Sequence, residues 1–398
     1  MKKAVVFNLW GNRNAGDMAI CLGTVSLLQD MGYKITFVSR FAEEQQDYRQ
    51  SKEYINDYHD NIEVEPGIFF LDRDNSKFRK VISYTKGITR LISPRDDKKV
   101  REIVADADVV FLNGGNLLRG NNITDYARLA ALFYPFKIAK QLNKKIVCLP
   151  QSTAKSSQFG INMLKRNLSN FNKVFIRESN SFIALNKEIK DVPFVQSTDA
   201  CFFIKDVPKA MSRFEKKYPS LIGENNNSIA LVLRSTTIGD LGEFTESKKK
   251  LFTDAITKFV KEYEKEYKIY FVVQTKKDKK FTEYVKDQID TKSNVTLIEE
   301  YDPYIIREIY RKMNFIVAMR LHAAILSLTA ETPVLGYFEE EWGLKNPGIM
   351  GDVGMPWTTN GEELIRIGKE LDNNREEYVE KIREFIKGEK TKIIENLK

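Results

Sequence analysis

The sequence predicts an α/β protein built from two Rossmann-like domains that face each other across a cleft. Short runs rich in Val, Ile and Phe alternate with longer helical patterns along the chain, which is typical of βαβ units. The runs are apolar at nearly every position, as required of parallel strands that helices cover on both faces. At 398 residues, the chain also exceeds what one ordinary hydrophobic core accommodates.

Ten apolar runs are the predicted strands, five in each half of the chain. They are separated by helical patterns such as the one over residues 250–267, so that helices can return the chain to the same edge of a sheet. The predicted strands are 3–10, 34–40, 108–115, 145–153 and 173–179 in the first half, and 228–234, 268–275, 294–300, 314–320 and 333–338 in the second.

The segment between the two series of strands predicts the domain boundary. Residues 205–228 contain two prolines, a run of Asn and many charges, without a strand pattern, which is typical of a linker. We therefore expect an N-terminal domain over 1–205 and a C-terminal domain over 228–360. The charged helical tail over 361–398 is expected to pack back on the N-terminal domain.

Composition limits the classes of partner and compartment. The formal net charge of +8 suits anionic small molecules or an anionic membrane surface at least as well as a nucleic acid. Basic residues interleaved with aromatic ones, as in nucleic-acid-binding modules, are not found, so we expect no nucleic-acid partner. The three cysteines lack Cys-x-x-Cys spacing, which argues against a disulfide framework and for a reducing, cytoplasmic compartment. No metal site is expected, because the usual ligand spacings are missing.

One segment of the first domain departs from the βα pattern. Residues 72–101 hold ten basic and four acidic residues, with apolar residues interleaved at roughly helical spacing. Two interpretations stay open: a solvated insertion, or an amphipathic surface that rests on anionic lipid or binds an anionic acceptor. The second would bring a cytoplasmic protein to the inner face of the membrane.

Two polar loops follow predicted strands of the first domain and are candidates for binding. In an open α/β sheet, ligands bind beyond the carboxyl ends of the strands, where glycines let the backbone approach an anion or a sugar hydroxyl. Neither loop matches a dinucleotide or P-loop motif, and glycines after strands are also common packing devices. An aspartate there serves equally well as a helix cap or as a base. The candidates are Asn14, Gly16, Asp17, Asn113, Gly114 and Gly115.

Three arginines end predicted strands: Arg177, Arg234 and Arg320. A single arginine at such a place is often part of a surface ion pair. Three at equivalent strand ends fit an anion clamp better, since the guanidinium group matches phosphate and carboxylate geometrically.

Of the two histidines, His322 is the candidate for chemistry and His59 is expected at the surface. His322 follows Arg320 by two residues and falls in the first turn of a predicted helix. The helix dipole disfavours a charged imidazole there unless an anion binds beside it. His322 is therefore expected to donate a proton when an anionic substrate is bound, although a lone histidine is more often a hydrogen-bonded core residue.

These motifs together resemble the polysaccharide pyruvyltransferase family. The resemblance runs from about residue 8 to residue 352 and rests on the order and spacing of five segments. The sequence departs from the family's pattern at two places. The Gly-rich turn reads "NGGN" rather than three glycines, and "LPQST" lacks the Gly that is usual in that strand-end turn. The five segments are "GNRNAGDMAI", "FLNGGNLL", "FIRESNSFIAL", "STDACFF" and "RLHAAILSLTAETPVLGYF".

The resemblance implies a GT-B-like architecture and a phosphoenolpyruvate (PEP)-dependent transferase. Such enzymes transfer the enolpyruvyl unit of PEP onto two hydroxyls of a sugar in a bacterial cell-surface polysaccharide or its precursor, giving a cyclic ketal and phosphate. PEP is then a substrate and no cofactor is expected. The acceptor is a saccharide, with a lipid-linked one as an alternative. By the same resemblance, Arg320 and Arg234 clamp PEP, His322 is the general acid, and Asp17 is the base or orients a hydroxyl.

Two other functions stay open on the sequence. A GT-B glycosyltransferase with a nucleotide-sugar donor would share the architecture, but it needs a carboxylate after the last strands, for which Glu331 is the obvious candidate. A non-catalytic sugar-nucleotide or polymer-binding protein would tolerate replacement of Arg320 and His322 without loss of turnover.

Overall fold

The computed structural model describes the chain except residues 70–96, 223–226, 236–243, 290–293, 340–341 and 344. The described residues divide into two compact units. The first comprises Met1–Asn12 and Ile20–Ala200, and the second comprises Arg13–Ala19 and Cys201–Lys398.

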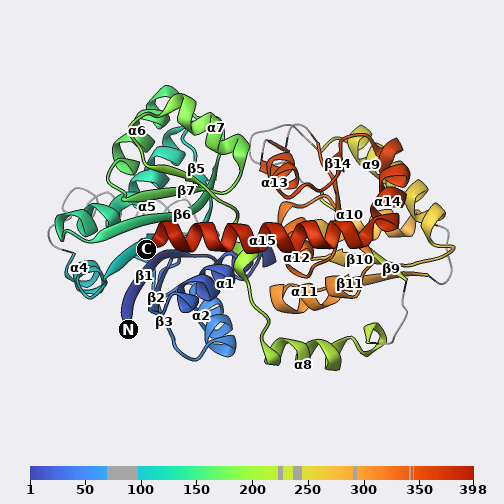
Figure 1. The fold of residues 1–398 in the computed structure, drawn as a ribbon, viewed down its shortest axis with the longest axis horizontal. Helices are drawn as coiled ribbons and strands as arrows, with labels where there is room; N and C mark the ends of the chain where they lie inside the picture. Colours follow the sequence, from blue (N-terminus) through green and yellow to red (C-terminus); the bar gives the residue numbers. More distant parts are fainter. Residues whose placement is uncertain (70–96, 223–226, 236–243, 290–293, 340–341, 344) are drawn as a thin grey trace. The chain divides into compact units, whose positions relative to one another are not determined.

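The first unit is a parallel sheet flanked by helices (Figure 1). Its strand order is β3-β2-β1-β4-β6-β7-β8, with β5 paired to β6, and each described pairing is parallel. The strands are β1 (Lys2–Leu9), β2 (Tyr33–Ser39), β3 (Ile62–Glu65), β4 (Val109–Leu112), β5 (Gly115–Leu118), β6 (Lys145–Thr153), β7 (Lys173–Ile176) and β8 (Phe194–Gln196). The helices are α1 (Ala15–Asp30), α2 (Gln46–Tyr58), α4 (Lys98–Ala105), α5 (Ile123–Gln141), α6 (Gln158–Leu168) and α7 (Ser179–Glu188).

The second unit repeats this architecture with the order β11-β10-β9-β12-β13-β14, again with parallel pairings. This order is that of the Rossmann fold. The strands are β9 (Ser228–Val232), β10 (Lys268–Val273), β11 (Val295–Glu299), β12 (Phe315–Ala318), β13 (Val334–Tyr337) and β14 (Trp357–Thr358). The helices are α8 (Pro208–Lys217), α9 (Glu246–Tyr263), α10 (Lys279–Asp287), α11 (Pro303–Arg311), α12 (Leu321–Thr329), α13 (Lys345–Val353), α14 (Leu364–Asn373) and α15 (Arg375–Leu397).

The fold class predicted from the sequence is confirmed: both units are parallel-sheet, Rossmann-like α/β domains. Each of the ten predicted strands is present, and most of the runs are apolar enough to be buried on both faces of the sheet. The edge strand β11 is only partly buried. Strands β3, β5, β8 and β14 were not predicted, since they are short and, in β3, alternate apolar with acidic residues. That the two units face each other across a cleft stays a prediction.

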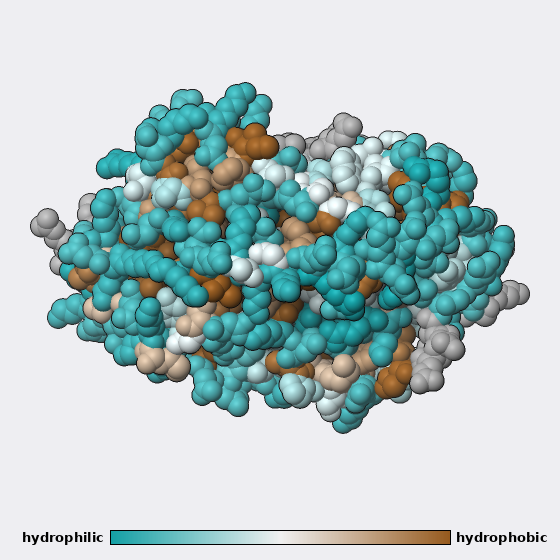
Figure 2. All heavy atoms as spheres, in the orientation of Figure 1, coloured by the Kyte–Doolittle hydropathy of each residue, from teal (hydrophilic) through white to brown (hydrophobic). Residues whose placement is uncertain are grey.

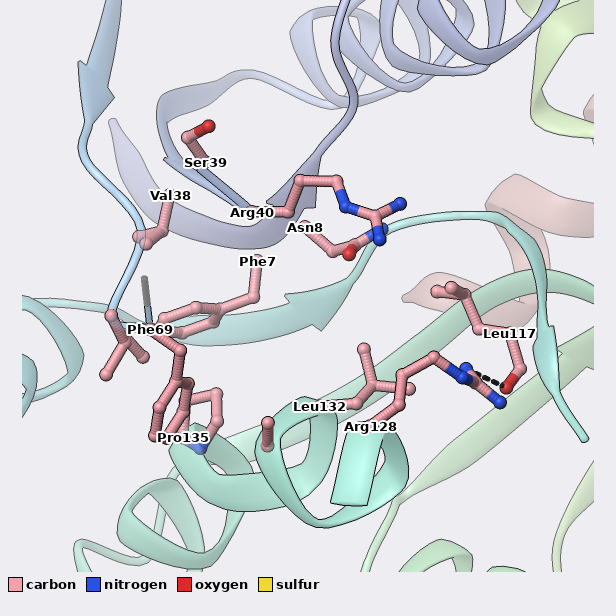
Figure 3. Close-up of a pocket in the computed structure, with 12 residues that line it drawn as sticks. Phe7, Asn8, Val38, Ser39, Arg40, Phe69, Leu117, Arg128, Leu132 and Pro135 are labelled. Atoms are coloured by element: carbon pink, nitrogen blue, oxygen red, sulfur yellow. Dashed lines mark hydrogen bonds between the residues drawn. The ribbon is translucent and has the colours of Figure 1, made fainter. Parts of the chain in front are cut away.

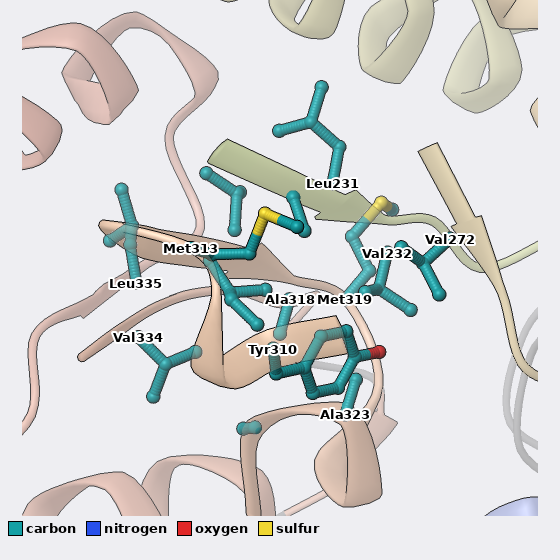
Figure 4. Packing of buried hydrophobic residues seen from close by; sticks show 14 of the residues in the cluster. Leu231, Val232, Val272, Tyr310, Met313, Ala318, Met319, Ala323, Val334 and Leu335 are labelled. Carbon is teal, nitrogen blue, oxygen red and sulfur yellow. The ribbon is translucent and has the colours of Figure 1, made fainter. Parts of the chain in front are cut away.

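The core of the second unit shows why β9 and β12 lie at its centre. Figure 4 shows apolar side chains of both strands, among them Leu231 and Ala318, packed together with Tyr310 and Met313. Every residue of β9 and of β12 is buried. Strands that are buried on both faces require continuous Val/Ile/Leu-rich runs. Polar residues are therefore found mainly at the ends of these strands.

Residues near the expected boundaries group differently from the predicted domains. Residues 13–19 group with the second unit, in whose core cluster Ala15 and Ala19 lie. Within the predicted linker, α8 packs on α11, and Asp206 forms an ion pair with Arg311 at 2.9 Å.

The tail forms α14 and α15. Within the second unit, Arg383 of α15 pairs with Glu331 at 2.7 Å, and Phe385 contacts Phe202 edge to face with ring centroids 5.3 Å apart. Packing of the tail on the N-terminal domain stays a prediction.

The surface is largely polar where it can be seen. Figure 2 shows one face covered mainly by hydrophilic side chains with scattered apolar ones. In the described part of the chain, no helix has both the length and the hydropathy that crossing a bilayer requires. The predicted amphipathic segment 72–101 lies mostly outside the described residues.

The buried strand β9 predicts a sharp contrast between two leucines of the second unit. Replacing Leu231, which is fully buried, with alanine should lower the free energy of unfolding by about 2–5 kcal/mol, because it leaves a cavity. The matched control is Leu251→Ala on α9, where the side chain is 60% exposed and a change within about 0.5 kcal/mol is expected. Urea unfolding of both variants measures this, and equal losses would contradict the central position of β9.

Candidate functional site

The candidate site of the second unit lies where its strand order reverses direction. In the order β11-β10-β9-β12-β13-β14, the chain proceeds outward in opposite directions from β9 and β12. Ligands of open α/β sheets bind at this switch point, beyond the carboxyl ends of the strands. Val232 pairs with Ala318 in the last register of these strands. Arg234 and Arg320 each follow two residues later, so the register brings the two predicted arginines to adjacent strand ends.

A buried carboxylate joins the two arginines. Asp278, which is 2% exposed, accepts a hydrogen bond from Arg320 Nη2 at 2.6 Å and another from its Nε. The same carboxylate accepts hydrogen bonds from the backbone N–H and the hydroxyl of Ser235, both at 3.0 Å. Since Ser235 follows Arg234 directly, one acid positions both strand ends.

Arg234 is a desolvated cation. Its side chain is 7% exposed and its Cζ lies 4.7 Å from the ring centroid of Trp342, a cation–π geometry. Burial, followed by repulsion from the Arg320 guanidinium, lowers the pKa of Arg234 to about 9, against the opposing effects of Asp278 and Glu339. The group is still charged at neutral pH, and a bound anion would stabilise it.

His322 lies in the first turn of α12, whose N-cap is Arg320. At this end of the helix the aligned peptide dipoles favour an anion. The imidazole is packed against Gly16: a Cβ atom added at Gly16 would lie 2.5 Å from Cβ, Cγ and Nδ1 of His322. Gly16 is therefore required for close approach inside α1, rather than for a tight turn.

The first turn of α1 brings the other loop candidates to the same unit. Asn14 forms an isolated antiparallel bridge with Thr275, which follows β10. Its Oδ1 accepts a hydrogen bond from the N–H of Gly16 at 3.1 Å, so the carboxamide caps the start of the helix. Asp17 is the next residue along the turn and is partly buried. Asn14, Gly16, Asp17, Arg234, Arg320 and His322 thus gather around the carboxyl ends of β9, β10 and β12.

The three loop candidates of the first unit are enclosed in its fold. Asn113 is fully buried: its Oδ1 accepts from the Thr24 hydroxyl at 2.9 Å, and its Nδ2 donates to the carbonyl of Asn8 at 3.3 Å. The carbonyl of Gly114 accepts from Nε1 of Trp10 at 3.0 Å. Gly115 has a φ of 148°, and a Cβ there would lie 2.8 Å from the Trp10 ring. These residues hold β1, β4 and β5 together, and contact with a substrate stays a prediction for them.

Arg177 forms a buried ion pair with Asp199. The side chains of both residues are 1% exposed, and Nη1 of Arg177 lies 2.6 Å from Oδ2 of Asp199. Nε donates to the hydroxyl of Ser152 as well. The guanidinium thus links β6 and β7 to the segment after β8, and a role in substrate binding stays a prediction. His59, expected at the surface, ends α2 and is partly buried, and this burial lowers its pKa.

Sequence reasoning missed Asp278, Ser235 and Trp342. Asp278 stands in the run "TKKDKK", where it resembles one charge of a solvated segment. The available signal was its place directly after the predicted strand 268–275, the same position that singled out the arginines. Groups of His, Cys, Asp and Glu suited to a metal were not found among the residues that the structure describes.

The buried pair predicts a large loss of stability on removing one partner. Asp199→Asn should lower the free energy of unfolding by about 3–5 kcal/mol, because it leaves the Arg177 charge buried without its carboxylate. The control is Asp191→Asn in the same unit, whose pair with Lys165 is exposed (83% and 48%) and should change stability by less than about 1 kcal/mol. Asp191 has a φ of 66°, which asparagine also tolerates. Chemical denaturation of both variants measures the difference, and a small effect of Asp199→Asn would show that Arg177 is stabilised by other groups.

Comparison with known proteins gives one family and a shared fold. The family model described as polysaccharide pyruvyl transferase matches residues 14–337. Among curated proteins, no match was found.

Several solved structures have the same fold at low sequence identity. UDP-GlcNAc 2-epimerase from Neisseria meningitidis bound to UDP-GlcNAc is similar with a TM-score of 0.59 and 16% identity, over 100% of this chain and 99% of that one. A glycosyltransferase from Rickettsia africae gives a TM-score of 0.56 and 11% identity, over 99% and 97% of the two chains. Phytolacca americana UGT2 complexed with UDP-2fluoro-glucose and pterostilbene gives 0.57 and 11%, over 100% and 99%.

Proposed function

The chain belongs to the polysaccharide pyruvyl transferase family, and from this premise we propose that it transfers the pyruvyl group of PEP to two hydroxyls of a saccharide. The product is a cyclic pyruvate ketal, with release of phosphate. The observation that carries the proposal is the pair of adjacent guanidinium groups, Arg234 and Arg320, at the switch point of the second sheet. Two neighbouring cations in a largely buried site favour a ligand with more than one negative charge.

PEP has the charges that this site would complement. Its phosphate and carboxylate would accept hydrogen bonds from Arg234 and Arg320, and the N-terminus of α12 would favour the same anion. Asp278 orients Arg320 through two hydrogen bonds, so the guanidinium plane is set before the donor binds. The cation–π contact with Trp342 likewise orients Arg234 before the donor binds.

His322 is the proposed general acid. Its imidazole would give a proton to the methylene carbon of PEP, which becomes the methyl group while positive charge develops on the carbon bearing the phosphate oxygen. A bound dianion next to the first turn of α12 would favour the charged imidazole that this step needs. Packing against Gly16 keeps the ring in one place.

The acceptor supplies two oxygens, and Asp17 is the proposed base or orienting group. The first sugar hydroxyl adds to the cationic carbon and gives its proton to Asp17. The second then displaces phosphate at the same carbon, which closes the ketal, and its proton leaves with the phosphate. One carbon–oxygen bond forms in each step, and the bond from that carbon to the phosphate oxygen breaks in the second. Asp17 shares the first turn of α1 with Gly16 and is partly exposed, so a hydroxyl can approach it.

The position of Glu331 does not support the alternative function, a glycosyltransferase with a nucleotide-sugar donor. It follows the C-terminal end of α12 and precedes β13, so it lies at the amino edge of the sheet, opposite the switch point. Its carboxylate forms two hydrogen bonds with Arg383, at 2.9 and 2.7 Å. A ribose-binding carboxylate of that class is expected at the carboxyl edge.

Thermal unfolding with PEP, with phosphate and with UDP- and GDP-sugars tests the donor. PEP at 100 times its dissociation constant should stabilise the protein by about 2.7 kcal/mol. Arg320→Ala should abolish this shift, whereas Arg383→Ala, which removes an exposed arginine of the same unit, should keep it. Stabilisation by a nucleotide sugar and not by PEP would replace this proposal with sugar transfer.

The Asp278 carboxylate gives a second, independent prediction. Asp278→Asn should lower the free energy of unfolding by about 3–5 kcal/mol without ligand, because it leaves Arg320 beside Arg234 with no buried acid between them. PEP should then stabilise this variant less than the wild type, because the Arg320 guanidinium is no longer oriented before the ligand binds. Parallel melts of both proteins over a PEP series measure this, and an equal or larger shift in the variant would contradict the orienting role of Asp278.

A further inference from the structure

The first unit contains a small pocket at the carboxyl end of its central strands (Figure 3). Phe7 and Asn8 come from the end of β1, and Arg40 follows β2. Strands β1 and β4 flank the switch point of this sheet, where ligands of α/β proteins bind. The cavity volume is about 90 Å³. A single water needs on the order of 10–15 Å³, so the pocket has room for a group of several non-hydrogen atoms.

One side of the pocket is apolar. Figure 3 shows Phe7, Phe69 and Pro135 gathered on that side, and Leu132 of α5 also lines the pocket. Two of these rings are fixed by neighbours: Phe7 meets Phe136 edge to face at 5.7 Å between centroids, and Phe69 meets Tyr134 at 5.4 Å. A preformed apolar surface of this kind favours an apolar group of matching size.

The opposite side carries two guanidinium groups. Arg128 of α5 donates to the carbonyls of Leu117 at 2.8 Å and Arg119 at 2.6 Å, the first of which is drawn in Figure 3. Its Nε also forms an ion pair with Asp125 at 3.5 Å. Burial lowers the pKa of Arg128. Arg40 is held over the Trp10 ring, with its Cζ 4.5 Å from the centroid. Both cations are therefore oriented without a ligand.

Asn8 adds a donor without a partner among the described residues. Its φ is 75°, in the left-handed region that asparagine tolerates. Its Nδ2 is buried and has no hydrogen-bond partner among the described residues, whereas its carbonyl accepts from Asn113. A buried amide donor is normally paired, and Asn8 lines the pocket, so an acceptor atom of a bound ligand would satisfy it.

The charge of the wall selects the ligand. Of the residues that line the pocket in the described part of the chain, Arg40 and Arg128 are charged, and the Asp125 partner of Arg128 is not among them. We propose that the pocket binds a small amphipathic anion, in which an apolar group lies against the aromatic side and a phosphate or carboxylate accepts from Asn8, Arg40 and Arg128. This site belongs to the first unit and does not depend on pyruvyl transfer in the second.

Four probes test the apolar group and the anionic group of the ligand, alone and joined: phenyl phosphate, benzoate, inorganic phosphate and phenol. Calorimetric titration of the full chain should show phenyl phosphate or benzoate binding at least about tenfold more tightly than inorganic phosphate and phenol, because only the joined groups use both sides. The tighter of the two identifies the anion. Trp10 emission should change on binding, since Arg40 lies over its ring. If phenyl phosphate and benzoate bind no more tightly than phosphate and phenol alone, the proposal is overturned.

Variants decide whether the binding occurs in this pocket. Ala131→Leu fills the pocket from α5 and should weaken binding of the tighter probe at least about tenfold. Arg40→Gln, at a partly exposed position, should do the same and serves where Ala131→Leu lowers the melting temperature. Arg320→Ala in the second unit should leave the affinity unchanged. Loss of probe binding in Arg320→Ala, or full affinity in Arg40→Gln, would overturn the assignment even if PEP binding is as proposed.

Discussion

The carboxylate of Asp278 is the interaction on which the switch point of the second unit depends. Parallel strands in register bring Arg234 and Arg320 to adjacent positions, and burial removes most of the water that would screen their repulsion. A single acid, placed after the neighbouring strand β10, accepts from Arg320 and from the residue that follows Arg234. The backbone can therefore bring two cations together because a third strand end supplies the opposite charge.

The two buried arginine–aspartate pairs show how similar sequence positions lead to different structures. Arg177 follows β7 and Arg320 follows β12, and each meets an aspartate. At Arg177 both partners are removed from solvent, so the pair serves the packing of β6 and β7. At Arg320 the guanidinium stays 16% exposed, which leaves donors available to a ligand. The difference in exposure, rather than the pairing itself, leaves Arg320 accessible to the proposed ligand.

Much of the fold and part of the site could be predicted from the sequence. Most of the ten predicted strands were identifiable because burial on both faces forces a continuous apolar run, and Arg320 and His322 were conspicuous because they interrupt one. The short strands could not be predicted, since β5 and β14 have too few residues to produce a pattern. The pairing of Asp278 with Arg320 and the buried place of Asn113 could not be predicted either. In both cases the partner comes from a distant part of the chain, and only the strand register brings the two together.

The contact between Gly16 and His322 has a consequence for the entropy of the reaction. An exposed histidine samples several rotamers, and ordering it when a ligand arrives costs binding free energy. Here the imidazole lies against the Cα of Gly16, where no side chain fits, so the ring loses that freedom when the protein folds. The entropy cost of ordering the imidazole therefore lowers the stability of the folded protein, and it does not lower the affinity for the ligand.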